Sequence, residues 1–327
     1  FVDQDGSTLL AHEIEIWNES GDSYVWVKVP QIDGGSNTDH IWMYYGNASA
    51  SDGQNPTGVW DEGGNNYFRM VQHFNETNGP HYDSTSNNVD FTTVDVSTQG
   101  GTGVAKIGGA DEFDRDGGVD EIMGDASDTA VDNLANYTYE AWIYPEGNQG
   151  TPSRPYGTII SKGWSDKRWI CYSGGDGMLS ANEAATTDAL SSASSGLTLN
   201  AWNYVVVTYN NSDRMIRLYN NAVEMSYTSQ TAGQGAPNDD ADEEIVIGNK
   251  GVNADETFIG YIDEVRISSV ARSADWIAAQ FKSMNDTFNT YGPEESKPVS
   301  NTFNVTLTVT DDGSPALQDS VTKTLDL

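Results

Sequence analysis

The stretch "FIGYIDEVRISSVARSADWI", residues 258–277, places two adjacent carboxylates, Asp263 and Glu264, inside a run that otherwise predicts a β-strand. Because side chains alternate along a strand, Asp263 should share the face of Val265, whereas Glu264 and Arg266 should lie on the opposite face. We therefore expect Asp263 to be buried and Glu264 to be solvated or paired across strands. A buried carboxylate must be protonated, hydrogen-bonded or bound to a cation, since an unpaired buried charge costs several kcal/mol.

Catalysis by this pair is not expected, because adjacent carboxylates on a strand point to opposite faces and cannot act on one substrate. The histidines offer no clearer chemistry. The four of them, His12, His40, His73 and His81, are scattered without an H-E-x-x-H or comparable spacing, so the sequence predicts no zinc site. His73 is expected to be a structural residue of the fold.

The composition indicates a folded, acidic protein. Of the 327 residues 37% are hydrophobic, which is enough for a sizeable core, and no stretch is long and apolar enough to span a membrane. The net charge of −33 disfavours nucleic acid and anionic membranes as partners and favours cations. Abundant Ser, Thr, Asn and Gly, with sequons such as "NYT" at Asn136, favour an extracellular or cell-surface location.

The elements that must position these residues are predominantly β-strands. Short alternating runs such as "YTYEAWIY" and "WNYVVVTY" are bounded by Gly, Asn, Asp and Ser, which is typical of antiparallel strands in a sandwich. One helix is predicted in "SADWIAAQFKSM", with Ser273 as its N-cap and Asp275 in its first turn. The fold class is therefore all-β, an antiparallel jelly-roll β-sandwich with a smaller N-terminal β-domain and a C-terminal β-hairpin.

Composition divides the chain into three segments. Residues 1–66 form a small N-terminal β-domain, residues 67–293 carry most of the strands, and residues 294–327 contain a linker and a hairpin around "DDGSP". Because a single hairpin is marginally stable in water, it should pack on the main body, complete a neighbouring module or be the remnant of a longer domain.

At this level the chain resembles known families. Residues 67–293, with "YTYEAWIYPEG", "LNAWNYVVVTYNNSDRMIRLYNNAVE" and "FIGYIDEVRISSVARSADWIAAQF", resemble a concanavalin A-like or laminin G-like jelly-roll domain. Residues 1–61, with "VDQDGSTLLAHEIEIWNESGDSYVWVKVPQID", resemble part of an uncharacterised β-domain of archaeal and bacterial surface proteins. The last 27 residues resemble the final strands of a polycystic kidney disease-type, immunoglobulin-like module.

The resemblance implies a calcium site. In similar sandwiches a loop like "HYDSTSNNVDF" lies against the strand that carries "IDEV", which implies a Ca²⁺ ion held by Asp83, Asn88 and Asp263. The alternative is that Asp263 accepts hydrogen bonds from backbone amides of the loop and that Asp83 forms an Asx-turn, without a metal ion.

The resemblance also implies carbohydrate or protein binding more often than catalysis. Glycoside hydrolases of this shape carry an E-x-D-x-x-E strand, and no such motif occurs here. Aromatic faces stack on sugar rings, and Trp164 in the polar loop "SKGWSDK" is the candidate carbohydrate contact.

Three functions remain open. The leading hypothesis is a non-catalytic, calcium-stabilised binding or adhesion module of a larger surface protein, with a glycan or cell-surface partner. A second is a structural subunit of an extracellular fibre or surface array that self-assembles by strand exchange through residues 296–327. A polysaccharide-active enzyme is the third.

Overall fold

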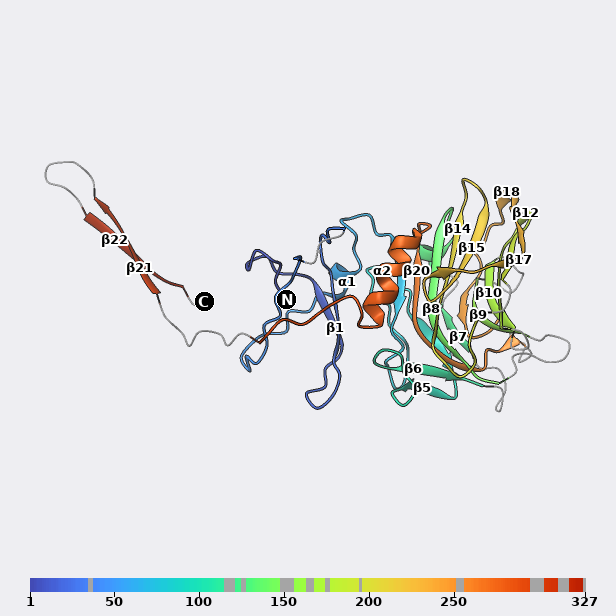
Figure 1. The fold of residues 1–327 in the computed structure, drawn as a ribbon, viewed down its shortest axis with the longest axis horizontal. Helices are drawn as coiled ribbons and strands as arrows, with labels where there is room; N and C mark the ends of the chain where they lie inside the picture. The colour runs from blue at the N-terminus through green and yellow to red at the C-terminus, as the bar shows by residue number, and fades with distance from the viewer. Residues whose placement is uncertain are drawn as a thin grey trace. The chain divides into compact units, whose positions relative to one another are not determined.

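The computed structural model describes residues 1–34, 38–114, 121–124, 128–147, 156–162, 168–173, 177–193, 196–250, 256–294, 303–310 and 318–325. The chain forms two compact units, Phe1–Asn285 and Asp286–Leu327, which are described separately. Both are built mainly from antiparallel strands, and the predicted all-β fold with a jelly-roll sandwich is confirmed (Figure 1).

The first large sheet contains eight strands. Their spatial order is β17 (Tyr227–Thr231), β13 (Ala189–Ala193), β11 (Met178–Glu183), β10 (Arg168–Ser173), β9 (Tyr156–Lys162), β19 (Ile245–Ile247), β7 (Glu121–Gly124) and β4 (Phe91–Asp95). All neighbours in this sheet pair antiparallel.

The second large sheet also has eight strands. Seven follow one another as β16 (Val223–Glu224), β15 (Met215–Asn220), β14 (Asn203–Asn210), β8 (Tyr137–Pro145), β20 (Gly260–Ser268), β6 (Ala110–Phe113) and β5 (Thr98–Gly101). The eighth, β3 (Phe68–Gln72), pairs with the second half of β20. The pairing of β3 with β20 thus joins the sandwich's first strand to its last.

The smaller elements surround this sandwich. They are β1 (His12–Ile16) paired with β2 (Tyr24–Val27), β12 (Ala185–Thr187) paired with β18 (Gln234–Pro237), helix α1 (Pro56–Val59), the 3₁₀ turn η1 (Thr129–Val131) and helix α2 (Ala274–Met284). As predicted, Ser273 caps α2, because its hydroxyl accepts a hydrogen bond from the Trp276 amide at 3.2 Å.

The hydrophobic core lies between the two large sheets. Aliphatic and aromatic side chains of both sheets interdigitate there, including Ile143, Val207, Ile160 and Ile262, each almost fully buried. A second cluster lies on the outer face of the sheet that contains β8 and β14, where Trp142 and Tyr204 pack against Ile277 and Met284 of α2. Figure 1 shows α2 on this outer side, next to β20.

Strand β20 departs from strict alternation at the acidic pair. Glu264 adopts a left-handed φ of 53°, and the pairing with β8 shifts register between Asp263 and Arg266, which is a β-bulge. Ile262, Val265 and Ile267 all belong to the sandwich core, so the extra residue reverses the phase of the strand. The predicted sharing of a face by Asp263 and Val265 is therefore wrong.

The predicted burial is confirmed for Asp263 but not for Glu264. Asp263 is fully buried, as predicted, but Glu264 and Arg266 are only 1% exposed and are not solvated. The guanidinium of Arg266 donates to Glu264 on the same strand. Trp26 and Trp60 of the N-terminal segment cover this face, so predicted surface charges become part of a buried network.

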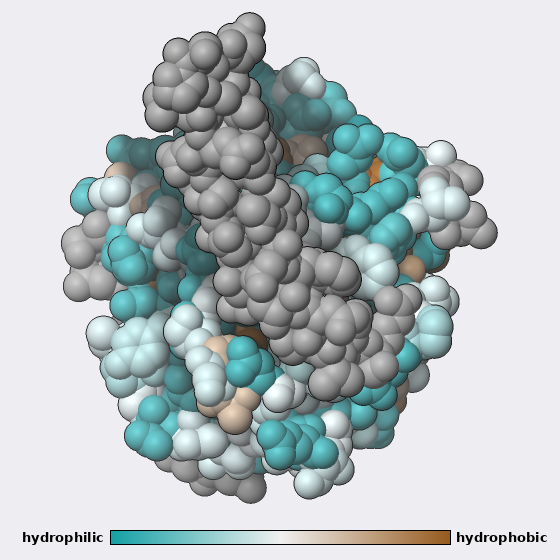
Figure 2. All heavy atoms as spheres, turned by 90° about the vertical axis from the view of Figure 1, so that its left-hand side faces the viewer, coloured by the Kyte–Doolittle hydropathy of each residue, from teal (hydrophilic) through white to brown (hydrophobic). Residues whose placement is uncertain are grey.

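The second unit contains the predicted C-terminal hairpin, in which β21 (Phe303–Thr310) pairs antiparallel with β22 (Gln318–Leu325) in uninterrupted register. Within the described residues, no helix is long and apolar enough to cross a membrane. The described surface in Figure 2 is mainly hydrophilic, with small scattered hydrophobic areas, in keeping with the acidic composition.

Candidate functional site

Asp83, a predicted calcium ligand, is buried and used as a hydrogen-bond acceptor. Its Oδ1 accepts from the Val71 amide at 2.9 Å and from the Thr85 amide at 2.9 Å. Its Oδ2 accepts from the Thr85 hydroxyl at 2.7 Å and from the Val89 amide at 3.0 Å. Burial raises the pKa of Asp83, against the opposing effect of these hydrogen bonds. The Thr85 contacts form the Asx-turn of the alternative prediction.

The other two predicted ligands have separate surroundings. Asp263 Oδ2 accepts from the Lys106 amide at 3.0 Å and from the Ile107 amide at 2.9 Å. Asn88 is exposed, has a φ of 54°, and donates to the Ser86 carbonyl at 3.1 Å. Among the described residues Asp83 and Asp263 share no hydrogen-bond partner, and calcium binding by Asp83, Asn88 and Asp263 stays a prediction.

A buried group of ionisable side chains lies where the N-terminal segment meets the sandwich. We call it the junction cluster, and its members are Glu13, Glu15, His73, Asp263, Glu264 and Arg266, all at most 9% exposed. Glu13 and Glu15 come from β1, His73 follows β3, and the last three come from the bulge of β20.

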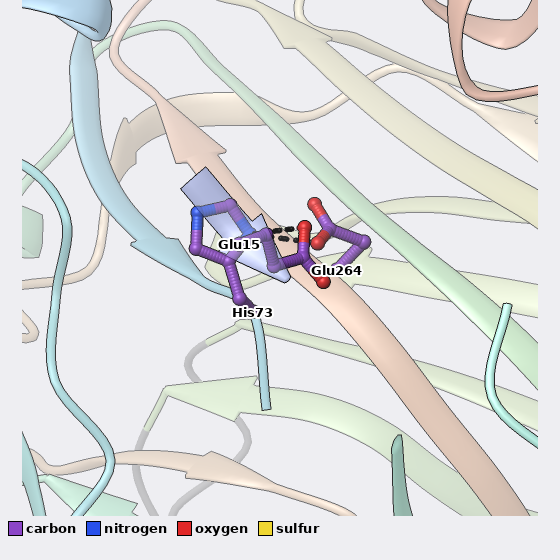
Figure 3. A group of neighbouring side chains, drawn as sticks. All are labelled: Glu15, His73 and Glu264. Atoms are coloured by element: carbon purple, nitrogen blue, oxygen red, sulfur yellow. Dashed lines mark hydrogen bonds and ion pairs between the residues drawn. The ribbon is translucent and has the colours of Figure 1, made fainter. Parts of the chain in front are cut away.

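His73 is at the centre of the junction cluster. Its Nδ1 lies 2.7 Å from Glu264 Oε1 and 3.5 Å from Glu15 Oε2, and its Nε2 lies 3.4 Å from Glu13 Oε2. Figure 3 shows Glu15 and Glu264 converging on one edge of the imidazole ring. These three residues bring their ligand atoms within 4.8 Å of one another.

Indole rings hold the junction cluster from the side of the N-terminal segment. Trp26 Nε1 donates to Glu15 and Trp60 Nε1 donates to Glu13, each at 2.7 Å. The Arg266 guanidinium lies 4.3 Å from the ring centre of Trp26 and 4.9 Å from that of Trp60. Cation–π contacts of this kind favour the charged form of arginine in a desolvated setting.

The electrostatics of the junction cluster divide its carboxyl groups. Burial, and then the negative charge of Glu264, raise the pKa of Glu15 to about 8. Burial and the charges of Glu264 and Glu15 raise the pKa of Asp263 well above its usual value. For Glu264, burial acts upward, but the charges of His73 and Arg266 outweigh it and lower the pKa.

The pKa of His73 is raised although the ring is buried. Burial alone disfavours the charged ring, yet the charges of Glu264 and Glu15 outweigh it and raise the pKa of His73 well above its usual value. Burial acts to raise the pKa of Glu13, but the hydrogen bond and the charge of His73 outweigh it and lower the pKa of that carboxyl. The geometry therefore favours a positive charge at the position of His73.

A second buried histidine offers a comparison. His81 Nδ1 lies 2.8 Å from Glu76 Oε2, and His81 Nε2 lies 2.7 Å from Asp111 Oδ2. Asp111 in turn accepts from the Gly100 amide at 2.7 Å. Burial opposes the charged ring, but these two carboxylates raise the pKa of His81 to about 9. Both ring nitrogens of His81 have a close carboxylate partner.

A shallow depression of about 230 Å³ opens next to the junction cluster. Its lining residues are Thr57, Trp60, Asp61, Gly64, Asn66, Thr85 and Ser86. The lining combines hydroxyl, amide and carboxylate groups with one indole ring, and it draws on both α1 and the loop after β3. Trp60 thus joins the depression to the junction cluster.

Neither the junction cluster nor the depression was predicted from the sequence. The signal for the first was present in "HEIEI" of β1, where Glu13 and Glu15 alternate with Ile14 and so share one face. In the structure that acidic face is the buried one, because it meets β20. The predicted carbohydrate contact, Trp164, lies outside the described residues.

Comparisons with known proteins agree with the fold. Residues 117–278 match the model of the concanavalin A-like lectin/glucanases superfamily, and residues 1–91 match a domain of unknown function called DUF2341. The resemblance to a concanavalin A-like domain and to an uncharacterised N-terminal domain is therefore confirmed, whereas the polycystic kidney disease-type module stays a prediction. A comparison with curated proteins finds no match.

Several solved structures match parts of this chain at low identity. The binding domain of Paraclostridial Mosquitocidal Protein 1 is 15% identical with a TM-score of 0.49; the match covers 66% of this chain and 52% of that one. Domain 4 of AbnA, an extracellular arabinanase from Geobacillus stearothermophilus, is 19% identical with a TM-score of 0.45 and covers 64% of this chain and 96% of that one. The botulinum neurotoxin type G receptor-binding domain is 13% identical with a TM-score of 0.44 and covers 65% and 50%.

Proposed function

We propose that the chain is a non-catalytic glycan-binding module of an extracellular protein and that the depression beside Trp60 takes part in binding. The observation that supports this is the mixture of groups around the depression. Sugar hydroxyls are bound by hydroxyl, amide and carboxylate side chains, while an aromatic ring contacts the apolar face of the sugar. Thr57, Asn66 and Asp61 supply the first kind of contact, and Trp60, which is 5% exposed, offers a small part of its ring for the second.

The two-part construction of the depression supports the same proposal. Thr57 and Asp61 belong to the N-terminal segment, and Thr85 and Ser86 belong to the loop that Asp83 fixes against β3. A site preformed by rigid neighbours loses little conformational entropy on binding. The match of residues 117–278 to a superfamily of lectins and glucanases makes carbohydrate the ligand class to test first.

A glycan array probed with the whole chain tests the proposal. Thr57 and Ser86 are exposed, and replacing both with alanine should weaken binding of any captured glycan at least about tenfold, while thermal stability stays unchanged. Asn88→Ala is the matched control, since Asn88 is an exposed polar residue of the same loop outside the lining. Binding that survives the double replacement but is lost in Trp164→Ala would place the sugar at Trp164 instead.

Calcium stabilisation and an adhesive role are further parts of this proposal, and an enzyme is its alternative. Turnover of a polysaccharide panel by the purified chain would contradict the non-catalytic proposal. A chelator that lowers the melting temperature of the native protein but leaves Asp263→Asn unaffected would support calcium at the predicted ligands.

A further inference from the structure

We propose that Glu15, His73 and Glu264 bind a divalent transition-metal ion, of the kind represented by Zn²⁺ or Mn²⁺, at the junction between the N-terminal segment and the sandwich. The site goes beyond glycan binding and uses none of the predicted calcium ligands. It would tie β1 to β20 through a shared ion.

The donor set selects the class of ion. One imidazole nitrogen and two carboxylates form a mixed nitrogen and oxygen site, which suits zinc and manganese, whereas calcium takes oxygen ligands only. In a tetrahedral site with bonds of about 2.1 Å, neighbouring ligand atoms lie roughly 3.4 Å apart. His73 Nδ1 and Glu15 Oε2 already lie 3.5 Å apart, the contact of 2.7 Å between His73 and Glu264 must lengthen, and the three ligand atoms all lie within 4.8 Å of one another.

The balance of charges supports a cation at this place. Four carboxyl groups of the junction cluster, Glu13, Glu15, Asp263 and Glu264, are buried together with one imidazole and one guanidinium. The guanidinium of Arg266 already donates to Glu264. A divalent ion would neutralise carboxylates that otherwise face one another in a medium of low dielectric constant.

A buried oxygen atom of one ligand provides independent support. Glu15 Oε1 has no hydrogen-bond partner among the described residues, although the Glu15 side chain is fully buried. Buried polar atoms are normally paired, so each such atom calls for a ligand, water or ion. Because the terminal torsion of a glutamate is broad, Glu15 can turn Oε1 toward an ion bound at Oε2.

The second buried histidine shows what a closed arrangement looks like. Both ring nitrogens of His81 lie within 2.8 Å of a carboxylate oxygen. By contrast, His73 Nε2 makes no hydrogen bond in the described part of the chain and faces its nearest carboxylate oxygen, Glu13 Oε2, at 3.4 Å. Two histidines flanked by acidic residues thus differ in one respect, since only the surroundings of His73 leave ligand atoms unsatisfied.

Titration of the full chain with Zn²⁺ after dialysis against EDTA tests the proposal. Isothermal titration calorimetry should show one Zn²⁺ per chain, and an excess of 100 times the Kd should raise the melting temperature by about 5 to 10 °C. Glu15→Gln and His73→Gln should each weaken Zn²⁺ binding at least about tenfold. The matched control His81→Gln should bind Zn²⁺ as the native chain does.

If these residues were purely structural, replacing them would lower the melting temperature even without a metal ion. The metal-site proposal expects no such loss for Glu15→Gln. In EDTA, Glu15→Gln should melt at about the same temperature as the native chain, because the amide has nearly the shape of the carboxyl group and keeps an acceptor for Trp26. The proposal is overturned if the native chain does not bind Zn²⁺. It is also overturned if Glu15→Gln and His73→Gln bind Zn²⁺ as tightly as the native chain does. Stabilisation by Ca²⁺ alone that Asp83→Asn abolishes also overturns it and places the cation at the predicted calcium ligands.

Discussion

Asp83 fixes the loop after β3 through four hydrogen bonds at a single buried carboxylate. Its donors are three backbone amides and the Thr85 hydroxyl. An ionised acceptor makes stronger bonds than a neutral one, and a buried amide left without a partner costs about 1 to 3 kcal/mol. The residue is therefore a structural anchor for the wall of the depression.

Asp83→Asn should lower the free energy of unfolding by about 2 to 4 kcal/mol, because the new amide group presents a donor to existing donors. Urea denaturation measures this. Asp90→Asn is the control, since Asp90 accepts one bond, from the Asp83 amide at 2.9 Å, and its replacement keeps an oxygen acceptor. If EDTA removes most of the difference between the native chain and Asp83→Asn, a bound cation and not the amide network explains the effect.

His81 gives stability a pH dependence with a defined sign. Its pKa is raised to about 9 in the folded chain, so folding favours the protonated ring, and this contribution is fully present below the ordinary pKa of about 6.5. It is lost as the pH rises from about 6.5 through 9.

In denaturation curves between pH 6 and 10, the native chain should therefore lose on the order of 2 to 3 kcal/mol more than His81→Gln, whose side chain does not titrate. Parallel profiles for the two proteins would show that His81 is not charged in the folded state.

At the scale of elements, the bulge in β20 creates the junction cluster. The left-handed conformation of Glu264 reverses the alternation, so that Ile262 and Val265 face the core while Asp263, Glu264 and Arg266 gather on the outer side. Bulges reorient side chains in this way at functional positions. The bulge also leaves the second half of β20 free to pair with β3.

The start of the same strand depends on a glycine. Gly260 has a φ of 129°, and a Cβ atom there would lie 2.0 Å from the Tyr144 carbonyl oxygen of β8. Gly260→Ala should destabilise the protein by about 3 kcal/mol or more, since it combines backbone strain with a clash against a neighbouring strand. Gly46→Ala is the control, with a φ of 81° and nothing within 4 Å of the added atom, and should cost only about 1 to 2 kcal/mol. Equal losses in thermal unfolding would mean that strain alone matters.

At the scale of the whole molecule, the hairpin of β21 and β22 belongs to a separate compact unit. A two-stranded hairpin is marginally stable alone, which is the reason to expect a further partner strand. If self-assembly by strand exchange occurs, concentration-dependent polymers seen by light scattering should disappear when residues 296–327 are deleted. Polymers that persist after the deletion would contradict that hypothesis, and the deletion should not alter Zn²⁺ binding at the junction cluster.

Local patterns determined much of this protein. Period-two alternation and turn residues were enough to predict an antiparallel all-β sandwich, and the Ser273 cap was enough to predict where α2 begins. Asp263 is buried as predicted, but on the outer side of the strand and not on the core face that alternation predicted. Each of these features depends on residues that are close together in the sequence.

The tertiary structure alone decided which acidic residues meet. A single inserted residue in β20 changed the face of Asp263 relative to Val265, and no periodic pattern reveals where a bulge falls. His73 and Glu264 are 191 residues apart, and Glu15 comes from a different β-element that buries its acidic face. The long-range pairing of β3 with β20, and the position of β1, whose Glu15 reaches His73, bring these charges together, so the candidate metal centre exists only in the folded chain.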